Sequence, residues 1–222
     1  MKKFLLLCSF FFGVHTANAQ FNPSRYDFRL GLTACPTFGM ISAEEGQGKG
    51  TNLGFAYGLM ADFNFAERYS LLTGLTITSV NGKSKEINAM PYHAVVSSTG
   101  AIEYNLKYKF QYIEIPLAIK LKTAEIGGVM WFGQFGLANG FRIKSRQDAY
   151  RGTTELAYHI NSASWTRFYR AGLLIGGGAE YALDSHTAVM AGLTLNNGLS
   201  NISTEQRTVK NHYVALNIGV FF

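Results

Sequence analysis

The chain has 222 residues, of which 47% are hydrophobic, 14% aromatic and 15% charged, and its formal net charge is +6 at pH 7. This composition excludes a disordered protein and an acidic tail, and the length allows one or two domains. With 24 glycines and no helical stripe or heptad pattern, the sequence favours β structure over a helical bundle.

The N-terminus has the pattern of a secretory signal peptide. Lys2 and Lys3 form a positive start, residues 4–14 are an apolar run, and a small-x-small cleavage site ends at Ala19. We therefore expect a signal peptide over residues 1–19 and one mature domain over residues 20–222.

Beyond residue 20 no stretch approaches the roughly 18 consecutive apolar residues of a membrane helix, which excludes a helical membrane protein. Cys35 is the one cysteine left after cleavage, so an intramolecular disulfide is excluded as well. Two classes of exported β protein remain. One is a soluble barrel, such as a lipocalin-like carrier, and the other is an outer-membrane β-barrel.

Eight segments alternate between apolar residues and small or polar ones with a period of two. Their apolar phases run over residues 28–40, 53–65, 71–77, 113–121, 131–143, 169–181, 189–195 and 214–222. The connections 66–69, 123–128 and 182–187 are short, whereas 41–52, 80–109, 144–164 and 201–211 are long. Short turns on one side and long loops on the other are typical of outer-membrane barrels. The sequence predicts an all-β, eight-stranded antiparallel up-and-down transmembrane barrel.

The second phase of these segments favours the membrane barrel over the soluble one. It is rich in glycine, which suits the crowded interior of a narrow barrel. A Lys or Arg facing lipid at mid-depth would cost about 2–4 kcal/mol, and the strand charges all fall on this phase: Arg29, Asp62, Glu114, Lys120, Arg142, Arg170 and Glu180.

These seven charges are predicted to face the lumen in two groups. Arg29, Asp62, Lys120 and Glu180 belong to the periplasmic end, and Glu114, Arg142 and Arg170 lie higher. Each group contains both signs, so we expect interior ion-pair networks that plug the barrel rather than a transport pathway.

The alternation breaks once. Residues 102–110 are apolar at even positions, whereas the chain from Ile113 is apolar at odd positions. A β-bulge or the membrane boundary near Tyr112 would explain this switch.

Two short segments resemble a known family. The stretch from Tyr112 through Glu114 and Pro116 to Leu117 resembles the most recognisable segment of the PorT-like outer-membrane β-barrel family, common in Bacteroidetes. The end of the chain resembles the C-terminal strand of that family, whose final aromatic residue, here Phe222, is similar to the signal read by the outer-membrane assembly machinery. The resemblance implies an eight-stranded barrel in the cell outer membrane, and the namesake of the family is a component of a protein-secretion system.

The sequence contains no recognised catalytic or metal-binding motif. The histidines most relevant to catalysis fall in loops, a turn or a strand edge: His93, His159, His186 and His212. We therefore expect no enzyme activity, no cofactor and no metal. Nucleic acid is not an expected partner, because the basic residues are dispersed and the protein is exported.

The long connections contain more Lys and Arg than Asp and Glu, which could hold lipopolysaccharide phosphates or an acidic partner. We expect a small barrel with a packed lumen and a structural or binding role through its extracellular loops. Its partners would be outer-membrane lipid, lipopolysaccharide and the assembly machinery. The alternatives are a secretion-system component that contacts other subunits, a lipid-modifying enzyme, and a narrow porin-like channel.

Overall fold

The computed structural model describes residues 28–44, 46–87, 103–204 and 208–222. The expected signal peptide over residues 1–19 and His93 lie outside the described residues. The described chain consists almost entirely of β-strands, with one short 3-10 turn over Ala163–Trp165. It contains no helix with the length and apolarity for crossing a membrane.

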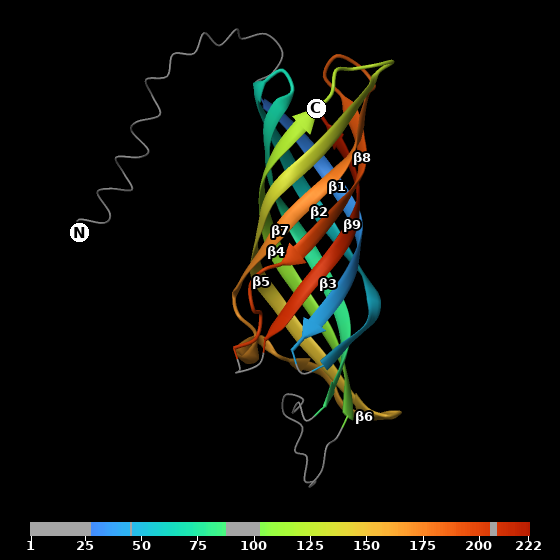
Figure 1. The fold of residues 1–222 in the computed structure, drawn as a ribbon, viewed down its shortest axis with the longest axis vertical. Coiled ribbons are helices and arrows are strands. Elements are labelled where there is room, and N and C mark those ends of the chain that lie inside the picture. Colours follow the sequence, from blue (N-terminus) through green and yellow to red (C-terminus); the bar gives the residue numbers. More distant parts are fainter. Residues whose placement is uncertain (1–27, 45, 88–102, 205–207) are drawn as a thin grey trace, which may run out of the picture.

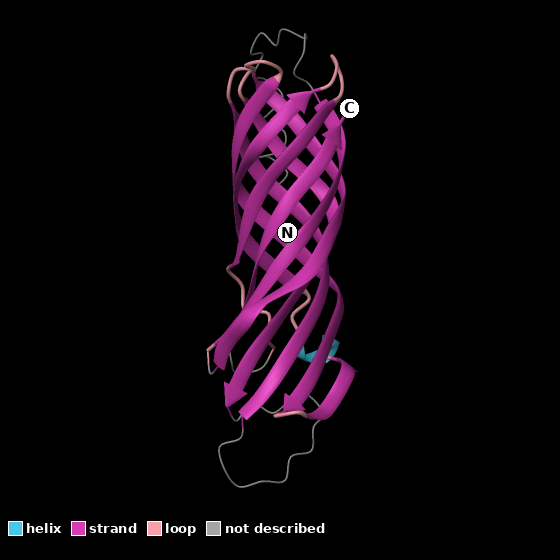
Figure 2. Cartoon of the chain, turned by 90° about the vertical axis from the view of Figure 1, so that its right-hand side faces the viewer, coloured by secondary structure: helices cyan, strands magenta, loops and turns pink. Residues whose placement is uncertain are grey.

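The described residues form nine strands that tilt around a common axis (Figures 1 and 2). Their bounds are β1 Phe28–Ala43, β2 Gly46–Ala66, β3 Tyr69–Ile87, β4 Glu103–Lys122, β5 Val129–Arg151, β6 Thr154–Asn161, β7 Tyr169–Ala182, β8 Ala188–Gly198 and β9 Val209–Phe221.

Eight of these strands close into a ring. Neighbouring strands pair antiparallel in the order β4-β3-β2-β1-β9-β8-β7-β5, and a further pairing of β4 with β5 completes the circle. The ninth strand, β6, pairs only with the end of β5. The predicted eight-stranded antiparallel up-and-down barrel is confirmed.

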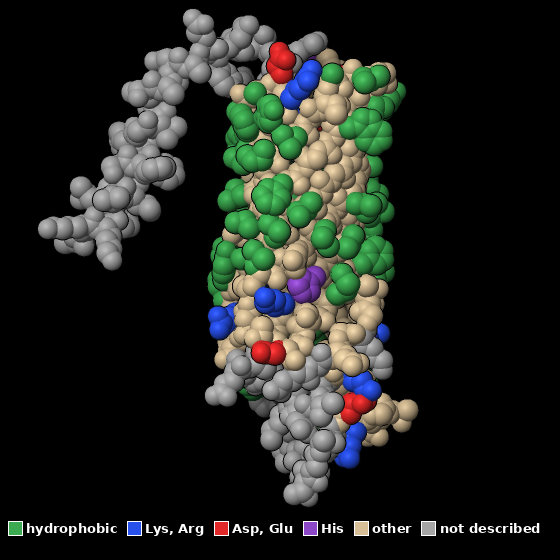
Figure 3. Space-filling view, viewed as in Figure 1, with side chains coloured by type: hydrophobic (Ala, Val, Ile, Leu, Met, Phe, Trp, Pro, Cys, Tyr) green, Lys and Arg blue, Asp and Glu red, His purple; other side chains and the backbone are tan. Residues whose placement is uncertain are grey.

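The two faces of each strand alternate as the sequence predicts. Leu32, Phe135 and Ile218 lie on the outer face and are 53%, 57% and 50% exposed, while lumen-facing residues such as Thr37 and Ala138 are almost fully buried. Hydrophobic side chains form a band around the upper part of the barrel in Figure 3. An outward apolar band is what a hydrocarbon environment requires.

The short turns lie where they were predicted, but three of the four predicted long connections are largely strand where the structure describes them; in the fourth, residues 201–204 and 208 lie between β8 and β9 outside the named strands. Strands β2 and β3, β4 and β5, and β7 and β8 are joined by short turns, whereas residues 41–43, 80–87, 103–109 and 144–151 continue the barrel strands. Residues 154–161 form the additional strand β6. We call residues 80–85, 103–111 and 143–151 together with β6 the extension. It lies at the lower end in Figure 1, opposite the C-terminus.

The pattern in the extension is inverted, which explains the error. Tyr104, Leu106 and Tyr108 are buried inside the ring, and Lys107 and Lys109 lie on the outside. A barrel surrounded by water buries apolar residues and exposes polar ones, opposite to a barrel in lipid. The apolar residues of β4 therefore occupy even positions in the extension and odd positions in the membrane-spanning part, although the strand itself is continuous.

The change of apolar phase near Tyr112 therefore marks the boundary between lipid and water, and β4 itself contains no bulge. Even-numbered residues of β4 face the lumen from Tyr104 to Lys122. The register irregularity lies in the partner strand: Tyr112 pairs with Arg142, whereas Gln111 pairs with Lys144. The extra residue is Ile143, and the lumen-facing residues of β5 change there from even to odd numbers.

Glycines on the lumen face allow the strands of this narrow barrel to pack closely. A Cβ atom added at Gly136 would lie 2.1 Å from the carbonyl oxygen of Leu117 and 2.7 Å from Cβ of Ala118. Three residues earlier in β5, a Cβ atom added at Gly133 would meet nothing within 4 Å. Gly133 lies on the outward phase of β5, so the two glycines compare a crowded lumen position with an open outer one.

Gly136→Ala is expected to lower the free energy of unfolding by about 1–3 kcal/mol, because overpacking forces the backbone to shift. Gly133→Ala is expected to be neutral or slightly stabilising, since alanine loses less backbone entropy on folding. Urea unfolding of the refolded protein, followed by tryptophan fluorescence, measures both. Equal effects of the two substitutions would contradict this account of the lumen glycines.

Candidate functional site

The lumen contains two polar clusters, separated along the barrel axis. What we call the lower cluster lies near the short turns, which are at the top in Figure 1, and consists of Arg29, Asp62, Lys120, Lys122 and Glu180. What we call the upper cluster lies toward the extension, at the bottom in Figure 1, and is centred on Glu114 and Arg170.

Contacts in the lower cluster cross the barrel. Arg29 contacts Asp62 at 2.9 Å and Glu180 at 2.8 Å. Lys120 contacts the same two carboxylates, with 3.0 Å to Asp62. Asp62 on β2 and Glu180 on β7 lie on opposite sides of the ring, so the two cations link opposite walls of the barrel.

Three features of this cluster were not predicted. Lys122 donates to Asp62 at 3.1 Å and to Asn64 at 2.7 Å. Phe132 and Phe221 point into the lumen, and the Nζ atom of Lys120 lies 4.5 Å and 4.8 Å from their ring centroids. Lys122, Phe132 and Phe221 all lie on the lumen phase, and this was the one feature of the sequence that could have indicated them. The two aromatic rings stabilise the buried ammonium group of Lys120 through cation–π interactions in the absence of water.

The upper cluster contains one ion pair, between Arg170 and Glu114, and hydrogen bonds with neighbouring side chains satisfy the other polar atoms of both residues. Arg170 contacts Glu114 at 3.0 Å, and Tyr213 donates to the other oxygen of Glu114 at 2.6 Å. Arg170 also donates to the side chains of Asn196 and Asn211. Arg170 is 0% exposed and Glu114 is 3% exposed. A buried pair of this kind holds the fold only when its remaining donors and acceptors are bonded, as they are here.

Arg142 does not join the upper cluster through any ion pair between described residues. It lies next to the β5 bulge and is half-buried. Its register partner is the lumen-facing Tyr112 and the extra residue Ile143 comes after it, so Arg142 lies on the predicted phase, although no ion pair between described residues joins it to Glu114.

The residues of the family motif serve the interior of the barrel. Tyr112 accepts a hydrogen bond from Asn211 at 3.2 Å, and Glu114 belongs to the upper cluster. Pro116 lies one lumen-facing position further along β4. The last residue, Phe222, faces outward near the short turns and is 57% exposed.

The extension has its own core. Leu106 and Val80 are 0% exposed, and they pack in one cluster with Tyr108, Phe110 and Ala149. At its edge, Asp148 accepts from Lys109 at 2.8 Å and from the backbone N–H of His159 at 2.8 Å. Burial opposes the charged carboxylate, but these hydrogen bonds outweigh it and hold the pKa of Asp148 below its ordinary value.

The outer face of the extension brings like charges together. Lys83 on β3 is directly opposite Lys107 on β4, and Lys109 on β4 is directly opposite Arg146 on β5. Lys144 lies opposite Gln111 on the same face. We call Lys83, Lys107, Lys109, Lys144 and Arg146 the basic stripe. In Figure 3, Lys and Arg side chains are seen below the apolar band.

The remaining histidines do not gather into a site. His186 lies in a short turn, and His212 on β9 accepts from the backbone N–H of Gly198 at 3.2 Å. The described residues contain no group of three or more His, Cys, Asp or Glu placed to hold a metal ion.

The sequence was compared with protein families. The family described as "Outer membrane protein beta-barrel domain" matches residues 9–204. The chain belongs to this family. The outer-membrane barrel is thus located in the cell outer membrane, with its short turns on the periplasmic side and the extension on the extracellular side.

Solved structures with similar folds include other small outer-membrane barrels. Neisserial surface protein A is 15% identical, with 86% of this chain and 95% of that chain covered and a TM-score of 0.47. OprG from Pseudomonas aeruginosa is 12% identical (89% and 96% covered, TM-score 0.44). Ail from Yersinia pestis is 10% identical (88% and 99% covered, TM-score 0.35). A comparison with curated proteins finds no match.

Asp62→Asn is expected to destabilise the barrel by about 3–5 kcal/mol, the range for breaking a buried ion pair. The substitution keeps the shape of the side chain but leaves three cations with Glu180 as their one remaining carboxylate in the cluster. Glu67→Gln, at an exposed position in a short turn, is the control. Urea unfolding in detergent measures both variants. An Asp62→Asn barrel as stable as the control would show that the cluster contributes little.

The contacts of Asp148 should make the β5–β6 hairpin sensitive to acid. Because the folded-state pKa is lowered, this stabilisation is complete above the ordinary value of about 3.9 and disappears as the pH falls through the folded-state pKa. Hydrogen-exchange protection of residues 154–161 should therefore fall below about pH 4. Asp148→Asn should lower the protection at neutral pH and remove its pH dependence, whereas Asp184→Asn in a periplasmic turn should change neither.

Proposed function

We propose that this protein is a closed membrane anchor whose extension binds phosphate groups of lipopolysaccharide at the cell surface. The proposal assigns lipopolysaccharide binding to the outer face of the extension and a structural role to the two polar clusters of the lumen. It includes no enzyme activity and no cofactor.

The basic stripe is the observation that carries the proposal. Like charges directly opposite each other on paired strands destabilise a sheet, by roughly 0.2–1 kcal/mol per pair. Two such pairs, Lys83 with Lys107 and Lys109 with Arg146, lie on three consecutive strands. Asp148, which contacts Lys109 and lies opposite Lys107, offsets part of this repulsion and leaves the stripe with a net positive charge. An anionic partner that bridges the two pairs would turn the remaining repulsion into binding energy.

The position of the stripe supports lipopolysaccharide as the partner. The stripe begins where the apolar band ends, next to aromatic residues that suit the membrane interface. Phe141 packs against Phe168 and Tyr169, with ring centroids 5.8 Å and 5.7 Å away. Lys144 follows Phe141 by three residues on β5. Phosphates of an outer-leaflet lipid would lie at this level.

The two lumen clusters support a closed anchor over a channel. Each one links opposite walls with buried side chains. Lipid-modifying activity is less favoured than binding, because the lumen carboxylates Asp62, Glu114 and Glu180 are each engaged in ion pairs.

Membership of the PorT-like group, with a role in protein secretion, is the second candidate. It is favoured by the motif around Tyr112, Glu114 and Pro116. In this structure, the motif residues lie in or beside the lumen, so secretion subunits would have to contact other parts of the protein. Co-purification of a large complex from native membranes would favour this second candidate.

The stripe can be tested by neutralising Lys83, Lys107 and Lys144 to glutamine together. We expect the triple variant to be as stable as the parent or slightly more stable, because repulsion is relieved. We also expect weaker binding of purified lipopolysaccharide and a weaker salt dependence of that binding. The control is Arg68→Gln in a periplasmic turn, where the residue is exposed. If the triple variant and the control bind lipopolysaccharide like the parent protein, the proposal is wrong.

A further inference from the structure

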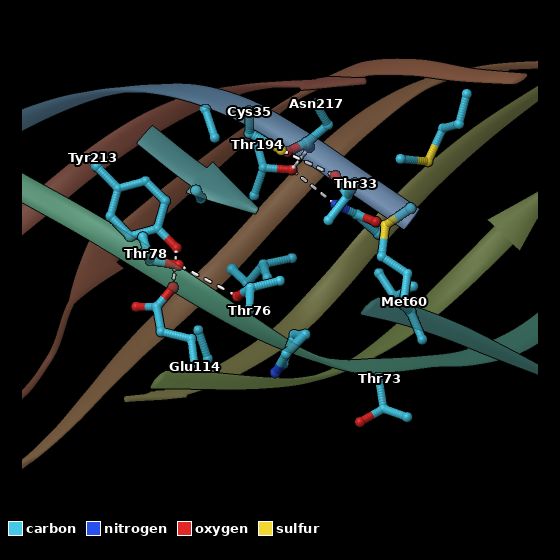
Figure 4. A pocket seen from close by; sticks show the side chains of 18 residues that line it. Thr33, Cys35, Met60, Thr73, Thr76, Thr78, Glu114, Thr194, Tyr213 and Asn217 are labelled. Carbon is cyan, nitrogen blue, oxygen red and sulfur yellow. Dashed lines mark hydrogen bonds between the residues drawn. The ribbon is translucent and has the colours of Figure 1, made fainter. Parts of the chain in front are cut away.

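A cavity lies in the membrane-spanning part of the lumen, between the two polar clusters. Its volume is about 90 Å³, larger than the roughly 10–15 Å³ that one water molecule requires and smaller than the ~150 Å³ engineered cavity that binds benzene. Apolar residues such as Leu72, Leu174 and Met190 line it together with several threonines. Figure 4 shows this cavity from close by.

The polar groups around the cavity bind each other. Thr194 accepts from Gln134 at 2.8 Å, and Thr33 donates to the carbonyl of Ile218 at 3.1 Å. Among the described residues, no lining side chain has a buried polar atom without a hydrogen-bond partner. The surface that faces the cavity is mainly apolar, and an apolar cavity favours an uncharged, apolar occupant.

The ladder between β3 and β4 is interrupted beside the cavity. The register runs to Leu72 opposite Ala118 and resumes at Thr76 opposite Glu114. Within this interruption, the register places Pro116 opposite Gly74. Proline has no N–H to donate, so the hydrogen bonding that joins the two strands is weakened here. Proline in a sheet is normally confined to edges or bulges, and a closed ring has no edge.

One lining residue of the cavity belongs to the outward phase at the same place. The lining residues lie on the lumen phase, with the exception of Thr73, which belongs to the outward phase of β3 and to the interrupted stretch. Figure 4 shows Thr73 set apart from the other labelled side chains. Pairing of β1 with β9 is also interrupted, at Cys35 and Pro36, but no outward-phase residue of these strands lines the cavity.

We infer that the β3–β4 seam at Gly74 and Pro116 is a lateral mouth, through which a small, uncharged, apolar molecule dissolved in the bilayer enters the lumen cavity and binds there. The two polar clusters close the axial routes from either side, which leaves the bilayer as the source. This site is separate from the basic stripe and does not depend on the proposed function.

Cys35 lines the cavity and is a natural reporter of access. The folded chain in phospholipid vesicles is treated with N-ethylmaleimide or with N-(2-aminoethyl)maleimide, and modification of Cys35 is mapped by mass spectrometry. The two reagents share one chemistry and differ by an ammonium group. We expect N-ethylmaleimide to react at least about tenfold faster, because a charged group is costly inside a bilayer. Xenon, an apolar atom small enough for a cavity of this volume, should slow this reaction when added as a competitor.

Two variants test the mouth itself. Thr73→Trp covers the opening, and Pro116→Val supplies the missing N–H; both should slow the reaction of Cys35 with N-ethylmaleimide several-fold. Leu137→Trp is the matched control, since it adds the same ring to the lipid face of β5, where pairing with β7 is continuous. A gel-mobility shift on boiling identifies the variants that fold.

Three results would overturn the inference. Equal rates with the two reagents would indicate an aqueous route, and no reaction in the folded parent would indicate a sealed cavity. An unchanged rate in a folded Thr73→Trp or Pro116→Val protein would place the mouth elsewhere.

Discussion

Backbone N–H and C=O groups inside a bilayer must find their hydrogen-bond partners within the protein, and the rest of this structure depends on that constraint. It forces the strands into a ring, which removes all edges. The ring is narrow, so its interior must be filled by side chains. Glycines at tight positions such as Gly136 and the paired charges of the lower cluster are both consequences of this closure.

The same constraint makes the two prolines in the barrel wall informative. Pro36 and Pro116 each remove one donor from a ring that has no edge, and each coincides with an interruption of pairing. Near Pro36 the interior side chains compensate, because the thiol of Cys35 on β1 contacts the amide oxygen of Asn217 on β9. Near Pro116 the opposing residue is a glycine, and no such bridge is present between the described side chains of β3 and β4 at this level.

Much of the barrel could be predicted because lipid and a narrow lumen impose opposite demands on alternate residues. Period two was enough to place Arg29, Asp62, Lys120 and Glu180 inside and to locate the three short turns. The extension was missed because water replaces lipid there: Lys107 and Tyr104 exchange the roles that such residues have deeper in the membrane. A prediction that assumes the same phase stays apolar along the whole strand interprets the inverted segment as a loop.

Other features depend on which residues meet, and alternation along one strand does not contain that information. The third cation on Asp62, the aromatic rings over Lys120 and the opposed lysines of the basic stripe all require the register between strands. Arg142 shows the same limit, since it occupies the predicted lumen phase opposite Tyr112 but forms no ion pair with Glu114 among the described residues.

That extra residue, Ile143, has a consequence for how this protein can change in length. Side chains alternate strictly along β5, so the bulge determines which residues beyond it face the core of the extension. Losing Ile143 would restore a regular ladder, because Arg142 and Lys144 already pair with the consecutive residues Tyr112 and Gln111, and Ser145, Gln147 and Ala149 would stay inside. A single-residue insertion or deletion elsewhere in this part of the strand, with no bulge to absorb it, would exchange the inside of the extension with its outside.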